Sequence, residues 1–134
     1  MNTLHQTRLI DIPKVHDKRG ALAVIEKDVI PFEIKRVYYL YDVPSDSFRG
    51  GHAHKEQESV IIALSGSFEV IVDDGISQKR IVLNKPTQGL YIPTSIWREI
   101  DNFSSGAVCL VLASTTYNEA EYIRNYDAFL SSKR

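Results

Sequence analysis

The chain alternates between short runs of apolar residues and clusters of turn residues. The runs are rich in Val, Ile, Leu, Phe and Tyr, which favour β-strands. The predicted strands are Ala21–Glu26, Ile34–Asp42, Glu58–Leu64, Ser67–Asp73, Gln78–Leu83, Gly89–Ile92 and Ala107–Ser114. Asp74-Gly75 lies between two of these runs and favours the tight turn of a β-hairpin. Many short strands at this spacing predict an all-β fold, an antiparallel sandwich or barrel.

The C-terminal part has a different periodicity. Asn118 is a good N-cap residue, and Glu121 follows three positions later, which is the spacing of a capping box. The apolar residues that follow recur at helical spacing: Tyr122, Ile123, Tyr126, Phe129 and Leu130. This pattern predicts one C-terminal helix that begins after Asn118 and packs on the β-structure.

Length and charge narrow the class of protein. The chain has 134 residues, which predicts a single domain over 1–134. A net charge of −1 gives no overall field that would attract nucleic acid or an anionic membrane. Cys109 is the only cysteine, so no intrachain disulfide can form, and the N-terminal residues lack a signal-peptide pattern. We expect a cytoplasmic protein without nucleic-acid or membrane partners.

The candidate chemistry lies around His52 and His54. Residues two apart in a strand point to the same side, so the two imidazoles share one face. A close pair of imidazoles can bind a metal ion or transfer protons near neutral pH. From the residues alone, both functions remain open.

The segment Gly51-His52-Ala53-His54, followed by Glu58 and Gly66, resembles the first motif of the cupin superfamily. The resemblance implies a jelly-roll β-barrel. Cupin metal sites take a further histidine from a second motif, and the position that corresponds to this histidine is Arg98. A guanidinium does not ligate metals in the ordinary way and repels divalent ions. We therefore expect no metal, with Glu58 beside the two histidines as the remaining alternative.

Cationic and phenolic side chains accompany the histidine pair. Arg49 precedes it, Lys55 follows it, and Arg36 and Tyr38 share one side of a predicted strand. With Arg98, such a cluster suits an anionic, hydroxylated ligand such as a nucleotide-sugar. Arg36, Arg49 and Lys55 are candidates to bind a diphosphate. Arg98 or Tyr38 is a candidate to stabilise a developing oxyanion.

A more specific resemblance covers nearly the whole chain. The segments that carry it are 17–22, 31–39, 49–55, 89–93, 97–99, 112–114 and 122–124. They resemble the sugar 3,4-ketoisomerase family of cupins. This resemblance implies a cofactor-free isomerase that converts dTDP-4-keto-6-deoxyglucose into a dTDP-3-keto-6-deoxyhexose, a precursor of 3-amino-3,6-dideoxy sugars. It implies that His52 and His54 are catalytic and that the enzyme is a homodimer with shared or swapped strands.

Three other classes remain as alternatives. A nucleotide-sugar 3,5-epimerase also removes a proton beside a carbonyl in a cupin barrel. A metal-dependent cupin dioxygenase would need a third ligand where Arg98 stands. A non-catalytic nucleotide-sugar sensor would keep the arginines without needing both histidines. The sequence does not say which of His52 and His54 is the principal base.

Overall fold

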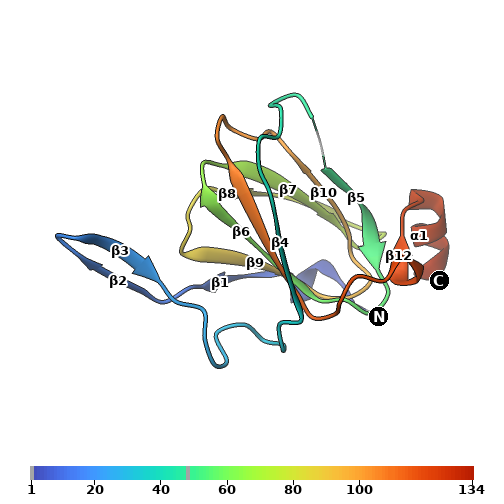
Figure 1. Cartoon of the computed structure of the whole chain (residues 1–134). Helices are drawn as coiled ribbons and strands as arrows, with labels where there is room; N and C mark the ends of the chain where they lie inside the picture. The colour runs from blue at the N-terminus through green and yellow to red at the C-terminus, as the bar shows by residue number, and fades with distance from the viewer. Residues whose placement is uncertain (1, 48) are drawn as a thin grey trace.

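Two antiparallel sheets face each other and make up most of the molecule (Figure 1). The computed structural model describes residues 2–47 and 49–134. The first sheet has the strand order β1-β9-β6-β11-β4. Its strands are β1 (Arg8–Asp11), β9 (Gln88–Ile92), β6 (Ser59–Ser65), β11 (Val108–Ala113) and β4 (Arg36–Leu40).

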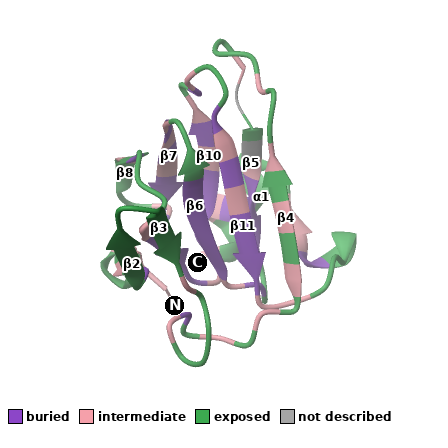
Figure 2. Cartoon of the chain, turned by 60° about the vertical axis from the view of Figure 1, so that its left-hand side comes forward, coloured by how far each residue is buried: buried purple, intermediate pink, exposed green. Residues whose placement is uncertain are grey.

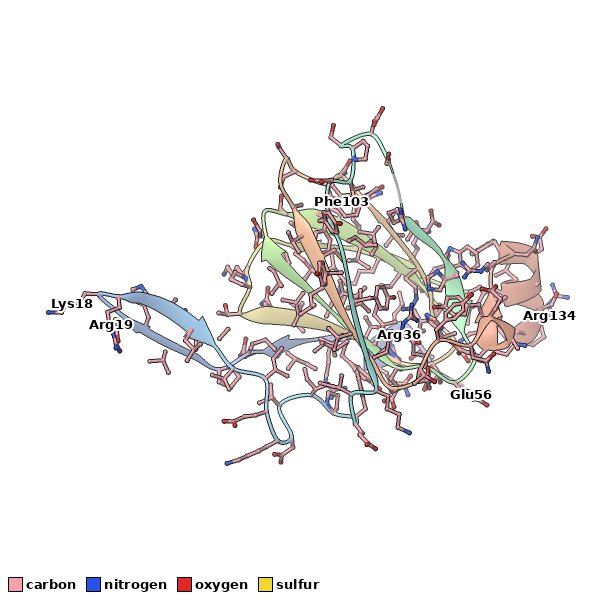
Figure 3. The ribbon with its side chains drawn as sticks, viewed as in Figure 1. Lys18, Arg19, Arg36, Glu56, Phe103 and Arg134 are labelled. Atoms are coloured by element: carbon pink, nitrogen blue, oxygen red, sulfur yellow. The ribbon has the colours of Figure 1, made fainter. Side chains whose placement is uncertain are left out.

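The second sheet has the order β12-β5-β10-β7-β8. Its strands are β12 (Tyr122–Ile123), β5 (Arg49–His54), β10 (Trp97–Asp101), β7 (Phe68–Asp73) and β8 (Gln78–Leu83). Alternate side chains of both sheets point inward and form the main core. Phe103, labelled in Figure 3, packs its ring against that of Phe68 in this core. The all-β prediction is confirmed, and the two sheets form a jelly roll of the cupin type without closing into a continuous barrel.

A separate hairpin of β2 (Lys14–Asp17) and β3 (Gly20–Ala23) projects from the two sheets (Figure 1). Every residue of both strands is exposed, as Figure 2 shows. Lys18 and Arg19 lie at its tip (Figure 3). The strand predicted over Ala21–Glu26 is observed as β3, which ends at Ala23. Its partner strand, β2, was not predicted.

Most predicted strands lie within a few residues of the observed ones. The run at Ile34–Asp42 shortens to β4, because only residues 36–40 pair with β11. The strands that the apolar runs did not reveal are β1, β2, β5, β10 and β12, which are short or carry many polar residues. The hairpin predicted at Asp74-Gly75 joins β7 and β8, so this prediction is confirmed.

The prediction of one C-terminal helix is confirmed, but its start is wrong. Asn118 caps a single 3-10 turn, Glu119–Glu121, by accepting from the N–H of Ala120. The helix, α1 (Tyr126–Ser132), begins at a second cap, Asn125, which accepts from the N–H of Ala128.

After the 3-10 turn, Tyr122 and Ile123 are extended, because β12 pairs with β5. Helix α1 packs on the outer face of the second sheet through Phe129, which contacts Ala53 and Trp97. None of the helices within 2–47 and 49–134 has the length and apolar character needed to cross a membrane.

Candidate functional site

A cavity of about 280 Å³ lies between the sheets, on the side of the molecule near β12. Four apolar side chains line part of its wall: Leu40, Ile61, Ile100 and Val111. The polar lining comes from β4, β5, β10 and the segment 117–124. It consists of Arg36, Tyr38, Arg49, His52, Arg98, Tyr117, Tyr122 and Arg124. The cavity thus brings together Arg36, Tyr38, Arg49, His52 and Arg98, which were predicted from the sequence as site residues.

The two histidines of β5 point to the same side, as strand geometry requires. Their Nε2 atoms are 3.0 Å apart, and their rings meet edge to face. His52 lines the cavity, whereas His54 is fully buried behind it. Of the two imidazoles, only that of His52 is therefore accessible from the cavity, and His54 is separated from the cavity by His52.

His54 has polar partners on both ring nitrogens. Its Nδ1 contacts a carboxylate oxygen of Glu121, and its Nε2 lies 3.3 Å from the amide nitrogen of Gln57. Burial lowers the pKa of His54, and the positive charge of Arg98 lowers it further. The resting imidazole is thus neutral, which is the form that can accept a proton.

Arg98 lies directly opposite His52 in the pairing of β10 with β5. Arg98 is 3% exposed, and its guanidinium donates to the carbonyl of Ile96, with the hydroxyl of Ser59 3.4 Å from Nη1. Burial lowers the pKa of Arg98 to about 10, so it stays cationic at neutral pH. No carboxylate of the described residues pairs with it.

Arg36 lies within a cluster of aromatic rings. Its guanidinium is 4.3 Å from the ring centre of Tyr38 and 5.2 Å from that of Tyr117, and it donates to the hydroxyl of Tyr122 at 3.1 Å. Burial raises the pKa of Tyr38, so its hydroxyl keeps its proton and can donate. These contacts orient Arg36 without neutralising its charge.

The segment 117–124 supplies site residues that the sequence analysis missed. Tyr122 packs against both imidazoles, with ring centres 5.0 Å from His52 and 4.4 Å from His54. The guanidinium of Arg124 lies 4.4 Å above the Tyr122 ring and pairs with Glu119. The apolar spacing assigned this segment to a packing helix. Within this segment, β12 is extended and pairs with β5, which brings the segment to the cavity instead.

Two candidates from the sequence lie elsewhere. Lys55 is exposed, and its amine is 3.3 Å from the carbonyl of Ala120, outside the cavity lining. Glu58 accepts a hydrogen bond from Tyr91 at 2.6 Å and does not join the histidines. Within the described residues, no three His, Cys, Asp or Glu side chains come together in a way that could hold a metal ion. The carboxylate beside the histidines is Glu121.

Comparisons with known proteins identify a family and similar enzymes. The FdtA family, described as WxcM-like, C-terminal, matches residues 5–134. The TDP-4-oxo-6-deoxy-alpha-D-glucose-3,4-oxoisomerase of Aneurinibacillus thermoaerophilus is 46% identical over 92% of this chain and 90% of its own.

Solved structures of 3,4-ketoisomerases are also similar to this chain. A 3,4-ketoisomerase from Helicobacter canadensis has a TM-score of 0.93 and 50% identity, covering 96% of this chain and 97% of that one. A mutant of the QdtA 3,4-ketoisomerase of Thermoanaerobacterium thermosaccharolyticum, in complex with TDP-4-keto-6-deoxyglucose, has a TM-score of 0.95 and 44% identity, covering 98% and 96%. A dTDP-4-dehydrorhamnose 3,5-epimerase from Bacillus anthracis, at 14% identity and a TM-score of 0.79 over 91% and 79%, shares the fold alone.

Proposed function

The chain belongs to the FdtA family of WxcM-like, C-terminal proteins, and on this basis we propose that it is a cytoplasmic sugar 3,4-ketoisomerase. It converts dTDP-4-keto-6-deoxy-D-glucose into a dTDP-3-keto-6-deoxyhexose, without a metal, in the supply of 3-amino-3,6-dideoxy sugars. The observation that carries the proposal is the histidine pair at a cavity lined by Arg36, Arg49 and Arg98, none of which forms an ion pair with a carboxylate of the described residues.

The cationic lining suits a nucleoside diphosphate. Among the described residues, none of the ion pairs involves Arg36, Arg49 or Arg98. Guanidinium groups bind phosphate oxygens through two parallel hydrogen bonds, and unpaired ones keep this capacity. Arg36 and Arg49 hold the diphosphate in the proposal, while Tyr38 and Arg98 bind the sugar. Lys55 has no part in it, because its side chain points outside the cavity.

The reaction moves a carbonyl by one carbon. A base removes the proton from carbon 3, which the neighbouring carbonyl acidifies, and an enediolate forms. A proton is then delivered to carbon 4, and the hydroxyl proton of oxygen 3 passes to oxygen 4, so that atoms balance. A neutral imidazole suits both transfers, since its unperturbed pKa is about 6.5.

His52 is the principal base in this proposal, because it lines the cavity and His54 does not. His54 acts through His52, across the 3.0 Å that separates their Nε2 atoms. Arg98, opposite His52 in the sheet, faces the oxygen on which negative charge develops. A preorganised donor at that position lowers the barrier.

The test is proton NMR of dTDP-4-keto-6-deoxyglucose incubated with the purified protein in deuterated water with a chelator. A 3-keto product carrying deuterium at carbon 4 supports the proposal. The configuration at carbon 4 shows which face is reprotonated. Exchange at carbon 5 would identify a 3,5-epimerase instead. Binding without any exchange would identify a sensor.

A His52→Ala variant checks the assignment of the base. Turnover should fall by about 10³-fold, because the proton acceptor at the cavity is lost. The dissociation constant for dTDP should stay within about threefold of wild type, since the arginines remain. Turnover close to wild type would refute the role of His52.

We further propose a homodimer in which the β2–β3 hairpin packs against a second copy. Val15 and Leu22 lie in register on this hairpin and are 59% and 60% exposed. The outer face of β4 and the residue that follows it carry a further exposed apolar stripe, Val37, Tyr39 and Tyr41. A hairpin of two short strands is marginally stable alone, so a partner surface would stabilise it.

Light scattering during gel filtration tests the dimer. The wild type should have twice the 15.2 kDa mass of one chain. A Val15→Glu/Leu22→Glu double variant should run as a monomer, because it places charges on the hairpin face. Ile76→Glu is the matched control, because Ile76 is 92% exposed outside the hairpin and should leave the dimer intact. A monomeric wild type would contradict the proposal.

A further inference from the structure

The side chain of Glu121 is buried directly behind the histidine pair, and the proposed function does not yet use it. It is 6% exposed and ends the 3-10 turn that precedes β12. One carboxylate oxygen contacts Nδ1 of His54. The other accepts the backbone N–H groups of Glu56 and Gln57 at 3.1 and 3.3 Å. Within 2–47 and 49–134, no Lys or Arg side chain pairs with Glu121, and its side-chain partner is the neutral imidazole of His54.

The contact with Glu121 determines which ring nitrogen of His54 carries the proton. An ionised carboxylate only accepts hydrogen bonds, so Nδ1 must be the donor. The opposite side of the ring agrees with this assignment. The amide nitrogen of Gln57 is 3.3 Å from His54 Nε2 and donates to Ser59, while the amide oxygen accepts from Thr115. An amide nitrogen only donates, so Nε2 of His54 presents a lone pair.

The lone pair on Nε2 of His54 faces the imidazole of His52. Nε2 of His54 is 3.0 Å from Nε2 of His52, which lines the cavity. In the opposite tautomer, the proton on His54 Nε2 would stand where a proton has to be accepted. The tautomer of His54 therefore decides whether the pair can take up a proton.

We propose that Glu121 is a positioning residue of the ketoisomerase reaction, because its carboxylate holds His54 in the Nδ1–H tautomer and stabilises the cation that the histidine pair becomes. The proposal rests on the proposed function for its catalytic part. The pair takes up one proton from carbon 3 and returns one to carbon 4, so it is neutral before and after the reaction. Glu121 supplies the negative charge in between, as the carboxylate does in other carboxylate–histidine pairs.

A structural role alone is the competing explanation, because Glu121 also ties down the backbone at residues 56 and 57. Glu121→Gln separates the two roles. The amide oxygen of a glutamine can still accept both backbone N–H groups. Its NH₂ group then points at His54 Nδ1 and donates to it, which forces the proton onto Nε2.

The experiment compares wild type, Glu121→Gln and the control Glu56→Gln. The control removes the same charge from an exposed neighbour that projects away from the site (Figure 3). In Glu121→Gln, kcat should fall by about 10²-fold while KM stays within about threefold, because binding groups are untouched. Glu56→Gln should keep wild-type kcat and KM.

Nitrogen-15 NMR of the histidine side chains gives a readout that does not depend on turnover. His54 of the wild type should show the Nδ1–H tautomer, and Glu121→Gln should show Nε2–H. A wild-type His54 protonated on Nε2, or a folded Glu121→Gln enzyme with wild-type kcat, would overturn the proposal. If the wild type lacks ketoisomerase activity, the proposed function fails, and the tautomer measurement still decides whether Glu121 positions His54.

Discussion

Arg98 combines deep burial with a charge that no acidic side chain of the described residues neutralises. A buried unpaired charge costs several kcal/mol of folding free energy. Such a cost is tolerated where the charge has a task, and here the guanidinium faces His52 across the sheet. At the scale of one residue, Arg98 therefore lowers the stability of the fold in return for its role in the site.

An Arg98→Met variant should move stability and activity in opposite directions. Its free energy of unfolding should rise by about 1–3 kcal/mol, because an apolar side chain of similar length replaces an unpaired buried cation. Its turnover should fall by about 10²–10³-fold through loss of the donor to the enediolate. Urea unfolding and the NMR assay measure the two effects. A variant that loses stability and keeps its activity would contradict both expectations.

At the scale of elements, the turns decide how the sandwich closes. Gly66 joins β6 and β7 with a φ of +67°, a conformation that favours glycine. A Cβ there would overlap the hydroxyl of Ser104 and lie 3.0 Å from the Cα of Ala107. Gly106 has a similar φ of +73°, but a Cβ there would meet nothing within 4 Å.

These two glycines form a matched pair of substitutions. Gly106→Ala should cost about 1 kcal/mol, the price of a left-handed conformation for an L-residue. Gly66→Ala should cost about 1–3 kcal/mol more, because it adds steric overlap in a packed turn. Chemical denaturation of both variants gives the difference directly. Equal losses of stability would show that the contact with Ser104 relaxes without cost.

The elements also show what the sequence could and could not predict. The strands that carry the core, such as β6, β7 and β11, were predicted because burial enforces apolar patterns. Strand β12 was missed because two residues are too few for a pattern, and its conformation depends on pairing with distant β5.

For the same reason, Glu121 was interpreted as part of a helix cap. His52, Arg36 and Arg98 were found because strand alternation and motif spacing place them. Residues placed by pairing of segments distant in the sequence, such as Tyr122 and Arg124, gave no local signal beyond their place in a resembling segment.

At the scale of the whole molecule, the buried neutral His54 links stability to pH. Burial and Arg98 lower its pKa in the folded state, whereas the unfolded chain has an ordinary value near 6.5. Below pH of about 6.5, the unfolded state binds a proton that the folded state does not. The stability of the molecule should therefore decrease as the pH falls from about 7 toward 5.

The contribution of His54 to this slope should approach 1.4 kcal/mol per pH unit, the value of about one proton. Urea unfolding at several pH values and at fixed protein concentration measures it. A His54→Gln variant should have a shallower slope over the same range, because its side chain does not titrate. Parallel slopes for the two proteins would show that His54 binds its proton in the folded state at least as readily as in the unfolded chain.

The segment 117–124 follows the last long strand, β11, in chain order, yet it supplies Tyr117, Glu121, Tyr122 and Arg124 to the site. One short stretch of chain therefore supplies both the edge strand of the second sheet and part of the wall of the cavity. A cut between Ala113 and Tyr117 would leave the five strands of the first sheet and four of the second on one polypeptide. The cavity would then depend on a separate peptide held only by non-covalent contacts.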